Sequence, residues 1–200
     1  NIYNGGRSEA FLGEVLEGRR DRWVIATKFN LRGLGDADLG THLREQLDES
    51  LRRLRTDRID LFQLHHAPAD DVDTARLLEV LDSFVQAGLV RAIGASNVAA
   101  WRLAECAALC RDHGFTPFAT VQGYWHLLAR GIETEVVPYA ERTGLGVLPF
   151  HPLGGGGVGT CRRQGRGQEM CGATSAAASS PYVRAMRSRK CRCASSYSCV

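Results

Sequence analysis

The stretch IDLFQLH (59–65) decides the fold, because it is an apolar, strand-like run that ends at a histidine. Its apolar residues do not alternate strictly with polar ones, which is typical of strands in a parallel sheet covered by helices. Similar runs that we predict as strands are WVIATKF (23–29), VRAIGAS (90–96), FATVQGYW (118–125) and LGVLPFHPL (145–153).

Segments with a helical period separate these strands. The clearest is 37–55, where leucines recur at three- or four-residue steps: Leu39, Leu43, Leu47, Leu51 and Leu54. We also predict a helix over 8–18, with Ser8 as its N-cap and an apolar stripe of Phe11, Leu12, Val15 and Leu16. The other predicted helices are 74–88, closed by Gly88, 98–114, and 132–144, kinked by Pro138.

The alternation of strands and helices predicts βαβ units of about 30 residues each. Either an open doubly wound sheet or a (β/α)8 barrel fits this order. The doubly wound dinucleotide-binding fold carries GxGxxG between a strand and a helix. Here GLG (33–35) is too short, and GGGG (154–157) is followed by no convincing helix. The barrel is therefore the favoured fold class.

The composition changes near residue 154. From there to the end there are eight Lys or Arg residues and one Glu, against 17 basic and 21 acidic residues before it. Five of the seven cysteines also lie in this last part, which shows neither a helical nor a strand period. We divide the chain into a barrel-like part, 1–153, and a basic tail rich in Cys, Ser and Gly, 154–200. The tail is predicted to be disordered or frame-shifted.

Several functional classes are disfavoured by the sequence. No apolar run of about 18 residues predicts a membrane helix, and the N-terminus does not resemble a signal peptide. A zinc site among the tail cysteines is an alternative, but they form no CxxC pairs and no histidine accompanies them. The stretch VRAMRSRKCR (183–192) is an alternative nucleic-acid site, without interleaved aromatic residues. We expect no metal, nucleic-acid or membrane partner, and a cytoplasmic location.

Polar residues stand where the predicted strands end, which is where α/β barrels carry their active sites. Each one alone has a plainer explanation: a lysine that reaches solvent, a structural histidine, a helix cap or a satisfied core amide. Five successive strands that end in this way favour a functional site. The residues are Lys28, His65, Ser96, Asn97, Gln122 and Phe150.

Six blocks of the chain, in order and with fitting spacings, resemble the aldo-keto reductase superfamily. The blocks cover about residues 1–156: YNGGRSE (3–9), VIATKF (24–29), LRRLRTDRIDLFQLHHAP (51–68), GLVRAIGASN (88–97), VQGYWHLLAR (121–130) and GVLPFHPLGGG (146–156). The resemblance implies a (β/α)8 TIM barrel of which about strands 3 to 7 are present with their helices. It also implies NADPH as the cofactor, with NADH as an alternative, and reduction of small-molecule aldehydes or ketones.

The resemblance also implies roles for single residues. Tyr3 matches the catalytic tyrosine that gives a proton to the carbonyl oxygen, and Lys28 matches the lysine that assists it, since a cation favours a neighbouring phenolate. His65 matches the histidine that orients the carbonyl. The nicotinamide carboxamide needs both donors and acceptors, and the matching residues are Ser96, Asn97 and Gln122. Phe150 matches an aromatic residue that stacks on the nicotinamide.

The chain also departs from the family pattern. The family's catalytic aspartate, five residues before the tyrosine, has no counterpart, because Tyr3 is the third residue. We therefore expect an N- and C-terminally incomplete member with weak or no turnover. The alternatives are a non-catalytic cofactor-binding or regulatory subunit of the same fold, and an inactive fragment. Substrate identity and oligomeric state are not readable from the sequence.

The doublet His65-His66 raises the question of a metal pair. Neighbouring residues of a strand point to opposite faces, so we expect the two rings to diverge and not to share a metal. On this interpretation His65 faces the barrel axis and His66 is a bystander at the edge of the site.

Overall fold

The computed structural model describes residues 3–34, 38–68 and 72–156. They contain a parallel five-stranded sheet in which the spatial order of the strands is the order of the chain. The strands are β1 Ala26–Phe29, β2 Ile59–Leu64, β3 Val90–Ser96, β4 Thr120–Tyr124 and β5 Gly146–Phe150. The predicted strands are confirmed, each at the predicted place and most of them shorter than predicted.

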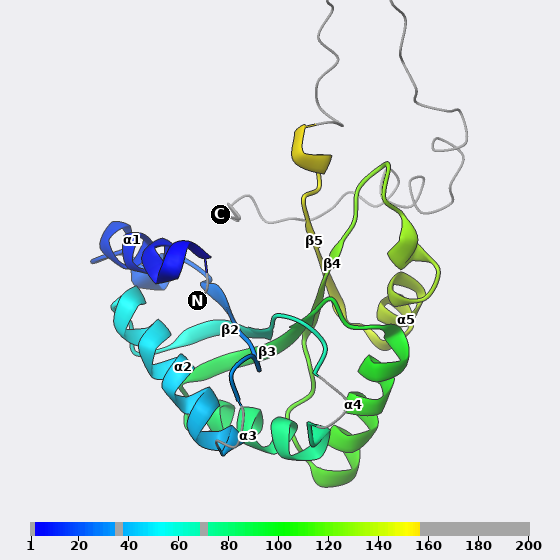
Figure 1. The fold of residues 1–200 in the computed structure, drawn as a ribbon, viewed down its shortest axis with the longest axis horizontal. Coiled ribbons are helices and arrows are strands. Elements are labelled where there is room, and N and C mark those ends of the chain that lie inside the picture. Colours follow the sequence, from blue (N-terminus) through cyan, green and yellow to red (C-terminus); the bar gives the residue numbers. More distant parts are fainter. Residues whose placement is uncertain (1–2, 35–37, 69–71, 157–200) are drawn as a thin grey trace, which may run out of the picture.

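Helices separate the strands, and Figure 1 shows α2 to α5 following one another in an arc along the outside of the sheet. A doubly wound sheet reverses its strand order and carries helices on both faces, whereas this sheet does neither. The architecture is a partial (β/α)8 barrel, as predicted. The α-helices are α1 Arg7–Val15, α2 Leu39–Leu54, α3 Thr74–Gln86, α4 Ala100–His113 and α5 Val136–Thr143, and the 3-10 turns are η1 Tyr3–Gly6, η2 Arg20–Arg22, η3 Gly131–Glu133 and η4 Gly154–Gly156.

The two faces of the sheet differ in chemistry. On one face most residues that alternate along the strands are apolar and buried against the helices, as Phe29, Phe62 and Ile93 are, with Thr27 and Asp60 as buried polar exceptions. The opposite face carries Lys28 beside Gln63 in the register of β1 and β2, and Gln63 beside Gly94 in that of β2 and β3. The helix-covered face is thus the core, and the other face can carry a site.

Helix α2 follows the predicted leucine pattern. Leu39, Leu43, Leu47 and Leu54 are buried, and the Asp38 side chain accepts a hydrogen bond from the Thr41 backbone N–H at 2.9 Å. An aspartate at this N-cap position satisfies one of the free N–H groups of the first turn.

The prediction for the first helix was partly wrong. Its N-cap is Gly6 and not Ser8, and its buried residues are Glu9 and Gly13, followed by Leu16. Phe11 and Val15, which we placed in the apolar stripe, are 65% and 43% exposed. The buried face of α1 is polar and small because the helix packs closely on α2 through Gly13 and through a buried carboxylate.

The predicted kink at Pro138 was also wrong. The helix that we placed at 132–144 begins only at Val136, so Pro138 lies in its first turn. The N–H groups of a first turn have no partner within the helix, and proline is therefore tolerated there without a kink.

The predicted tail, 154–200, is described only in its first residues, where η4 forms a short turn. Residues 157–200 lie outside the described residues, and the predictions of disorder, of a frame shift and of the alternative zinc and nucleic-acid sites stay untested. Within the described ranges, no helix is both long enough and apolar enough to cross a membrane.

Candidate active site

The predicted site residues lie at the carboxyl end of the sheet. Lys28 is in β1, His65 follows the last residue of β2, and its backbone N–H donates to the Phe29 carbonyl at 2.9 Å. Ser96 ends β3 directly beside Gln122 of β4. Because parallel strands end at a common edge, residues far apart in the sequence are gathered there.

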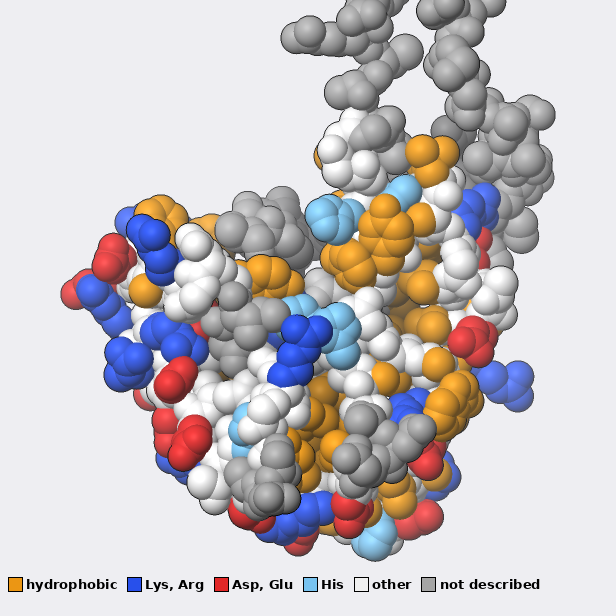
Figure 2. Space-filling view, viewed as in Figure 1, with side chains coloured by type: hydrophobic (Ala, Val, Ile, Leu, Met, Phe, Trp, Pro, Cys, Tyr) orange, Lys and Arg blue, Asp and Glu red, His pale blue; other side chains and the backbone are white. Residues whose placement is uncertain are grey.

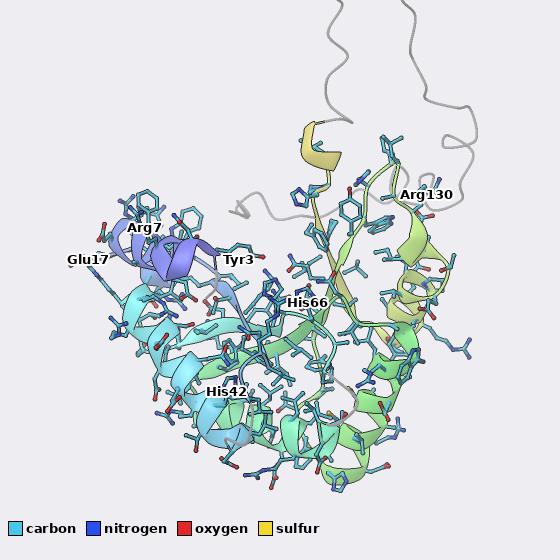
Figure 3. All side chains as sticks on the ribbon, in the orientation of Figure 1. Tyr3, Arg7, Glu17, His42, His66 and Arg130 are labelled. Atoms are coloured by element: carbon cyan, nitrogen blue, oxygen red, sulfur yellow. The ribbon has the colours of Figure 1, made fainter. Side chains whose placement is uncertain are left out.

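Tyr3, Lys28 and His65 form one cluster. The Tyr3 hydroxyl lies 3.4 Å from His65 Nε2, and the Lys28 ammonium lies 5.3 Å from the centre of the Tyr3 ring. In Figure 3, Tyr3 lies at the end of the N-terminal helical segment that faces the middle of the sheet, where His66 is labelled. A phenol, a cation and an imidazole therefore meet at one place.

His65 is held in its neutral form. Its side chain is buried, and burial lowers its pKa to about 4, with the positive charge of Lys28 acting in the same direction. Burial also lowers the pKa of Lys28. The buried Nδ1 atom of His65 makes no hydrogen bond. A neutral imidazole can accept a hydrogen bond at one nitrogen and donate one at the other.

Asn97 joins the histidine to the neighbouring strands. Its side-chain amide donates to the His65 carbonyl and to Ser96 Oγ, both at 3.1 Å, and its backbone N–H donates to the Gln122 carbonyl at 2.9 Å. Its backbone is left-handed, with φ at 56°, which asparagine tolerates better than most residues. The alternative that Asn97 caps the next helix is wrong, because the N-cap of α4 is Ala99.

Phe150 belongs to a separate aromatic group. Its ring centre lies 5.3 Å from that of Tyr124, its neighbour in the register of β4 and β5, and 5.7 Å from that of His151. Phe150 thus packs against Tyr124, which lies two residues after Gln122 in β4. It stands beside the site and outside the cluster of Tyr3, Lys28 and His65. Figure 2 shows hydrophobic side chains beside histidine side chains in the upper part of this face, and a further group of histidine and basic side chains at its centre.

The expectation that the His65 and His66 rings diverge was wrong. Their centres are 4.7 Å apart and their planes differ by only 2°, so the rings are stacked. Strand β2 ends at Leu64, and the alternation of faces therefore stops before the doublet. His66 remains exposed while His65 is buried. No group of three or more His, Cys, Asp or Glu in the described part of the chain could hold a metal ion.

Sequence reasoning missed two polar residues beneath the site. Gln63 and Thr120 flank Gly94 on the site face, and the buried Gln63 Oε1 and Thr120 Oγ1 atoms have no hydrogen-bond partner. A Cβ at Gly94 would lie 2.4 Å from Thr120 Oγ1, so only glycine fits there. A polar residue near the end of the strand-like run IDLFQL was the available signal for Gln63.

A second missed feature is the carboxylate of Glu9. It accepts hydrogen bonds from Thr27 Oγ1 at 2.6 Å and from Arg53 Nε at 2.7 Å, in the interior between α1, α2 and β1. The apolar stripe predicted for the first helix does not coincide with the face that carries Glu9 and Gly13. Glu9 and Gly13 are four residues apart and therefore lie on the same face of the helix. This spacing was the available signal that their face is the buried one.

The fold and the gathered polar residues define a class: a barrel of parallel strands with its site at their carboxyl ends. The model of the aldo/keto reductase family matches residues 1–187, and the chain belongs to this family. The match runs beyond residue 156, where the resemblance of single blocks ends.

The relatives agree with this family. The norsolorinic acid reductase stcV of Emericella nidulans is 37% identical over 78% of this chain and 43% of its own length. The aflatoxin B1 aldehyde reductase member 4 of Homo sapiens is 36% identical over 78% of this chain and 47% of its own. An aldo/keto reductase from Klebsiella pneumoniae, solved with NADP and acetate, has a TM-score of 0.67 at 29% identity, over 78% of this chain and 52% of that one. The chain thus spans about half the length of these relatives.

Proposed function

We propose that this chain carries the catalytic half of an NADPH-dependent reductase of aldehydes or ketones. The observation that carries the proposal is the cluster in which the Tyr3 hydroxyl lies 3.4 Å from His65 Nε2, with the Lys28 ammonium 5.3 Å from the tyrosine ring. Reductases of carbonyl compounds are among the relatives, and a structural neighbour was solved with NADP.

Each residue of the cluster has a task in this reaction. The Tyr3 hydroxyl gives its proton to the carbonyl oxygen, and the Lys28 cation stabilises the phenolate that remains. Neutral His65 donates a hydrogen bond from one ring nitrogen and orients the carbonyl. When bound, the reduced nicotinamide supplies the hydride for the carbonyl carbon.

The residues beside the cluster fit a nicotinamide carboxamide. Ser96, Asn97 and Gln122 offer a hydroxyl and two amides, a set of donors and acceptors that complements a carboxamide. The buried polar atoms of Gln63 and Thr120 that make no hydrogen bond lie on the same face and favour a polar ligand there. Phe150 is the candidate for stacking on the nicotinamide ring.

We also propose a small-molecule carbonyl substrate and a cytoplasmic location. The free, buried cysteines Cys106 and Cys110 support the second point, because reduced thiols are usual in the cytoplasm.

A titration of the full chain tests the proposed function. NADPH fluorescence is followed as protein is added, and the oxidation of NADPH is then measured with an aromatic aldehyde. We expect binding, and a weak carbonyl-dependent oxidation that Tyr3→Phe lowers further without loss of binding. Binding without oxidation would instead favour the non-catalytic cofactor-binding subunit. Absence of binding at about 1 mM NADPH, a concentration that would reveal even a weak complex, would contradict the proposal.

A further inference from the structure

Three elements of the fold meet at a single carboxylate. Glu9 of α1 accepts a hydrogen bond from Thr27 of β1 at 2.6 Å and an ion-paired one from Arg53 of α2 at 2.7 Å. Arg53 also donates to Glu49 at 2.7 Å, one helical turn away on α2. The first helix is thus tied to the second helix and to the first strand through one side chain.

The carboxylate is buried, which makes its geometry strict. Glu9 is 5% exposed and Thr27 is 7% exposed. Burial by itself raises the pKa of Glu9, but the hydrogen bonds from Thr27 and Arg53 outweigh it, and the pKa lies below its usual value. A buried charge that loses its partners is strongly unfavourable, so the three side chains hold one another in place.

The Arg53 side chain also lies against the turn that carries Tyr3. Asn4, Gly5 and Gly6 all have left-handed backbones, with φ at 50°, 61° and 86°. A Cβ at Gly6 would lie only 2.9 Å from Arg53 Cδ. The path of the chain from Tyr3 into α1 is therefore set by contact with the Arg53 side chain that Glu9 holds.

The other partner of Glu9 leads to the rest of the cluster. Thr27 directly precedes Lys28 in β1. The next residue of the strand, Phe29, accepts through its carbonyl the hydrogen bond of the His65 backbone N–H. One carboxylate therefore connects the turn of Tyr3 with the strand of Lys28. The exposed ion pairs of the same region, such as Arg55 with Glu17, lie at the far end of α1 and contribute little.

We propose that Glu9 is a positioning residue, which through Arg53 and Thr27 fixes the Tyr3 hydroxyl against His65 and Lys28. This inference rests on the proposed function for its effect on turnover, but its geometric part does not. Glu9 does not touch the reacting atoms. Displacement of a catalytic group by about 1 Å can lower a rate by about 100-fold, so a loosened turn has a measurable effect.

The test uses Glu9→Gln in the full chain, which keeps the size and one acceptor oxygen of the side chain but replaces the other oxygen with an amide donor and removes the charge. Its matched control is Glu17→Gln, which removes an exposed ion pair in the same region. Two quantities are measured: kcat and KM for an aldehyde with saturating NADPH, and the nuclear Overhauser effect between the Tyr3 and His65 ring protons. We expect Glu9→Gln to lower kcat about 10- to 100-fold and to abolish the ring contact, and Glu17→Gln to change neither.

Thr27→Val serves as a second variant if Glu9→Gln fails to fold, because it removes one hydrogen bond and leaves the ion pair. A normal contact between the Tyr3 and His65 rings in Glu9→Gln overturns the proposal, whether or not kcat falls. Substitution of a residue that positions Tyr3 must displace the tyrosine. A lost ring contact in a chain whose wild type shows no turnover supports the positioning role and contradicts the proposed function alone. The two failures are thereby distinguished.

Discussion

The doublet of His65 and His66 shows how two adjacent, stacked rings can differ in their surroundings. His65 is buried, lies 3.4 Å from the Tyr3 hydroxyl and has a pKa lowered to about 4, whereas His66 is exposed. Their parallel rings are 4.7 Å apart, so His66 covers one side of the imidazole that we place in the reaction. The buried ring is the one that can orient a carbonyl.

Substitution of each histidine separates the two roles. We expect His65→Ala to lower kcat for an aldehyde by about 100- to 10,000-fold, the range of a group that acts on a proton or hydrogen bond in the transition state. His66→Ala removes only a stacked neighbour, and we expect its kcat to stay within about threefold of wild type. Steady-state oxidation of NADPH measures both, and equal losses in the two variants would contradict the assignment.

The lowered pKa of His65 also predicts a dependence of stability on pH. The imidazole is neutral in the folded chain down to about pH 4, but in the unfolded chain it gains a proton near its usual pKa of about 6.5. Between these values the unfolded state binds more protons, so the free energy of unfolding falls as the pH falls through this window.

Urea unfolding of wild type and of His65→Asn at about pH 7 and about pH 4.5 measures this contribution. We expect the free energy of unfolding to fall more in wild type than in the variant, because the variant has no imidazole to protonate. Other titratable groups are common to both proteins and cancel in the difference. Equal losses in the two proteins would show that His65 keeps an ordinary pKa.

At the scale of elements, the packing of α1 on α2 depends on a glycine. A Cβ at Gly13 would lie 2.4 Å from the Arg53 carbonyl oxygen and 2.8 Å from the Leu54 carbonyl carbon, both in the backbone. Backbone atoms of a helix cannot turn away as a side chain can. The two helices must therefore separate if this position carries any side chain.

We expect Gly13→Ala to lower the free energy of unfolding by about 1–3 kcal/mol, the usual cost of overpacking. Gly131→Ala is the matched control, because a Cβ there meets nothing within 4 Å and its φ is not in the left-handed region. We expect the control to change stability by less than about 0.5 kcal/mol. Urea denaturation followed by circular dichroism measures both, and a Gly13→Ala variant as stable as the control would refute the close approach.

The elements that could be predicted from the sequence are those whose burial follows hydrophobic periodicity. The burial of the α2 leucines and of the apolar strand residues follows from the hydrophobic effect, and the alternation of these strands with helices predicts the parallel sheet. Helix α1 breaks this rule, because its buried face is made of Glu9 and Gly13. Ion pairing and close backbone contact are not visible in a pattern of apolar residues.

The candidate site was predictable in the same uneven way. The positions of Lys28, Ser96 and Gln122 follow from where the strands end, since parallel strands share an edge. The contact of Tyr3 with His65 could not be predicted from the strand ends. It depends on the turn of three left-handed residues after Tyr3 and on the Arg53 side chain that lies against this turn. The stacking of the two histidines also could not be foreseen, since it depends on the residue at which β2 ends.

At the scale of the whole molecule, the sheet of the described residues is open. Its order places β1 and β5 outermost, so each pairs with a strand on one side only. A strand at the edge of a sheet presents unpaired N–H and C=O groups, which are able to pair with another chain. The apolar Leu148 lies in β5, beside Gln122 in the register.

This arrangement predicts that the 200-residue chain associates with itself as its concentration rises. We expect sedimentation velocity to show a growing fraction of dimers or larger species over a range of about 1 to 100 μM. A charge that points inward on an edge strand opposes such pairing. Leu148→Lys should therefore shift the chain toward monomer, whereas Leu153→Lys, at a residue 62% exposed and outside the strand, should change the association little. Because both variants add the same charge, an equal effect would assign the association to net charge, and a chain that stays monomeric throughout would show that the outer strands are covered in solution.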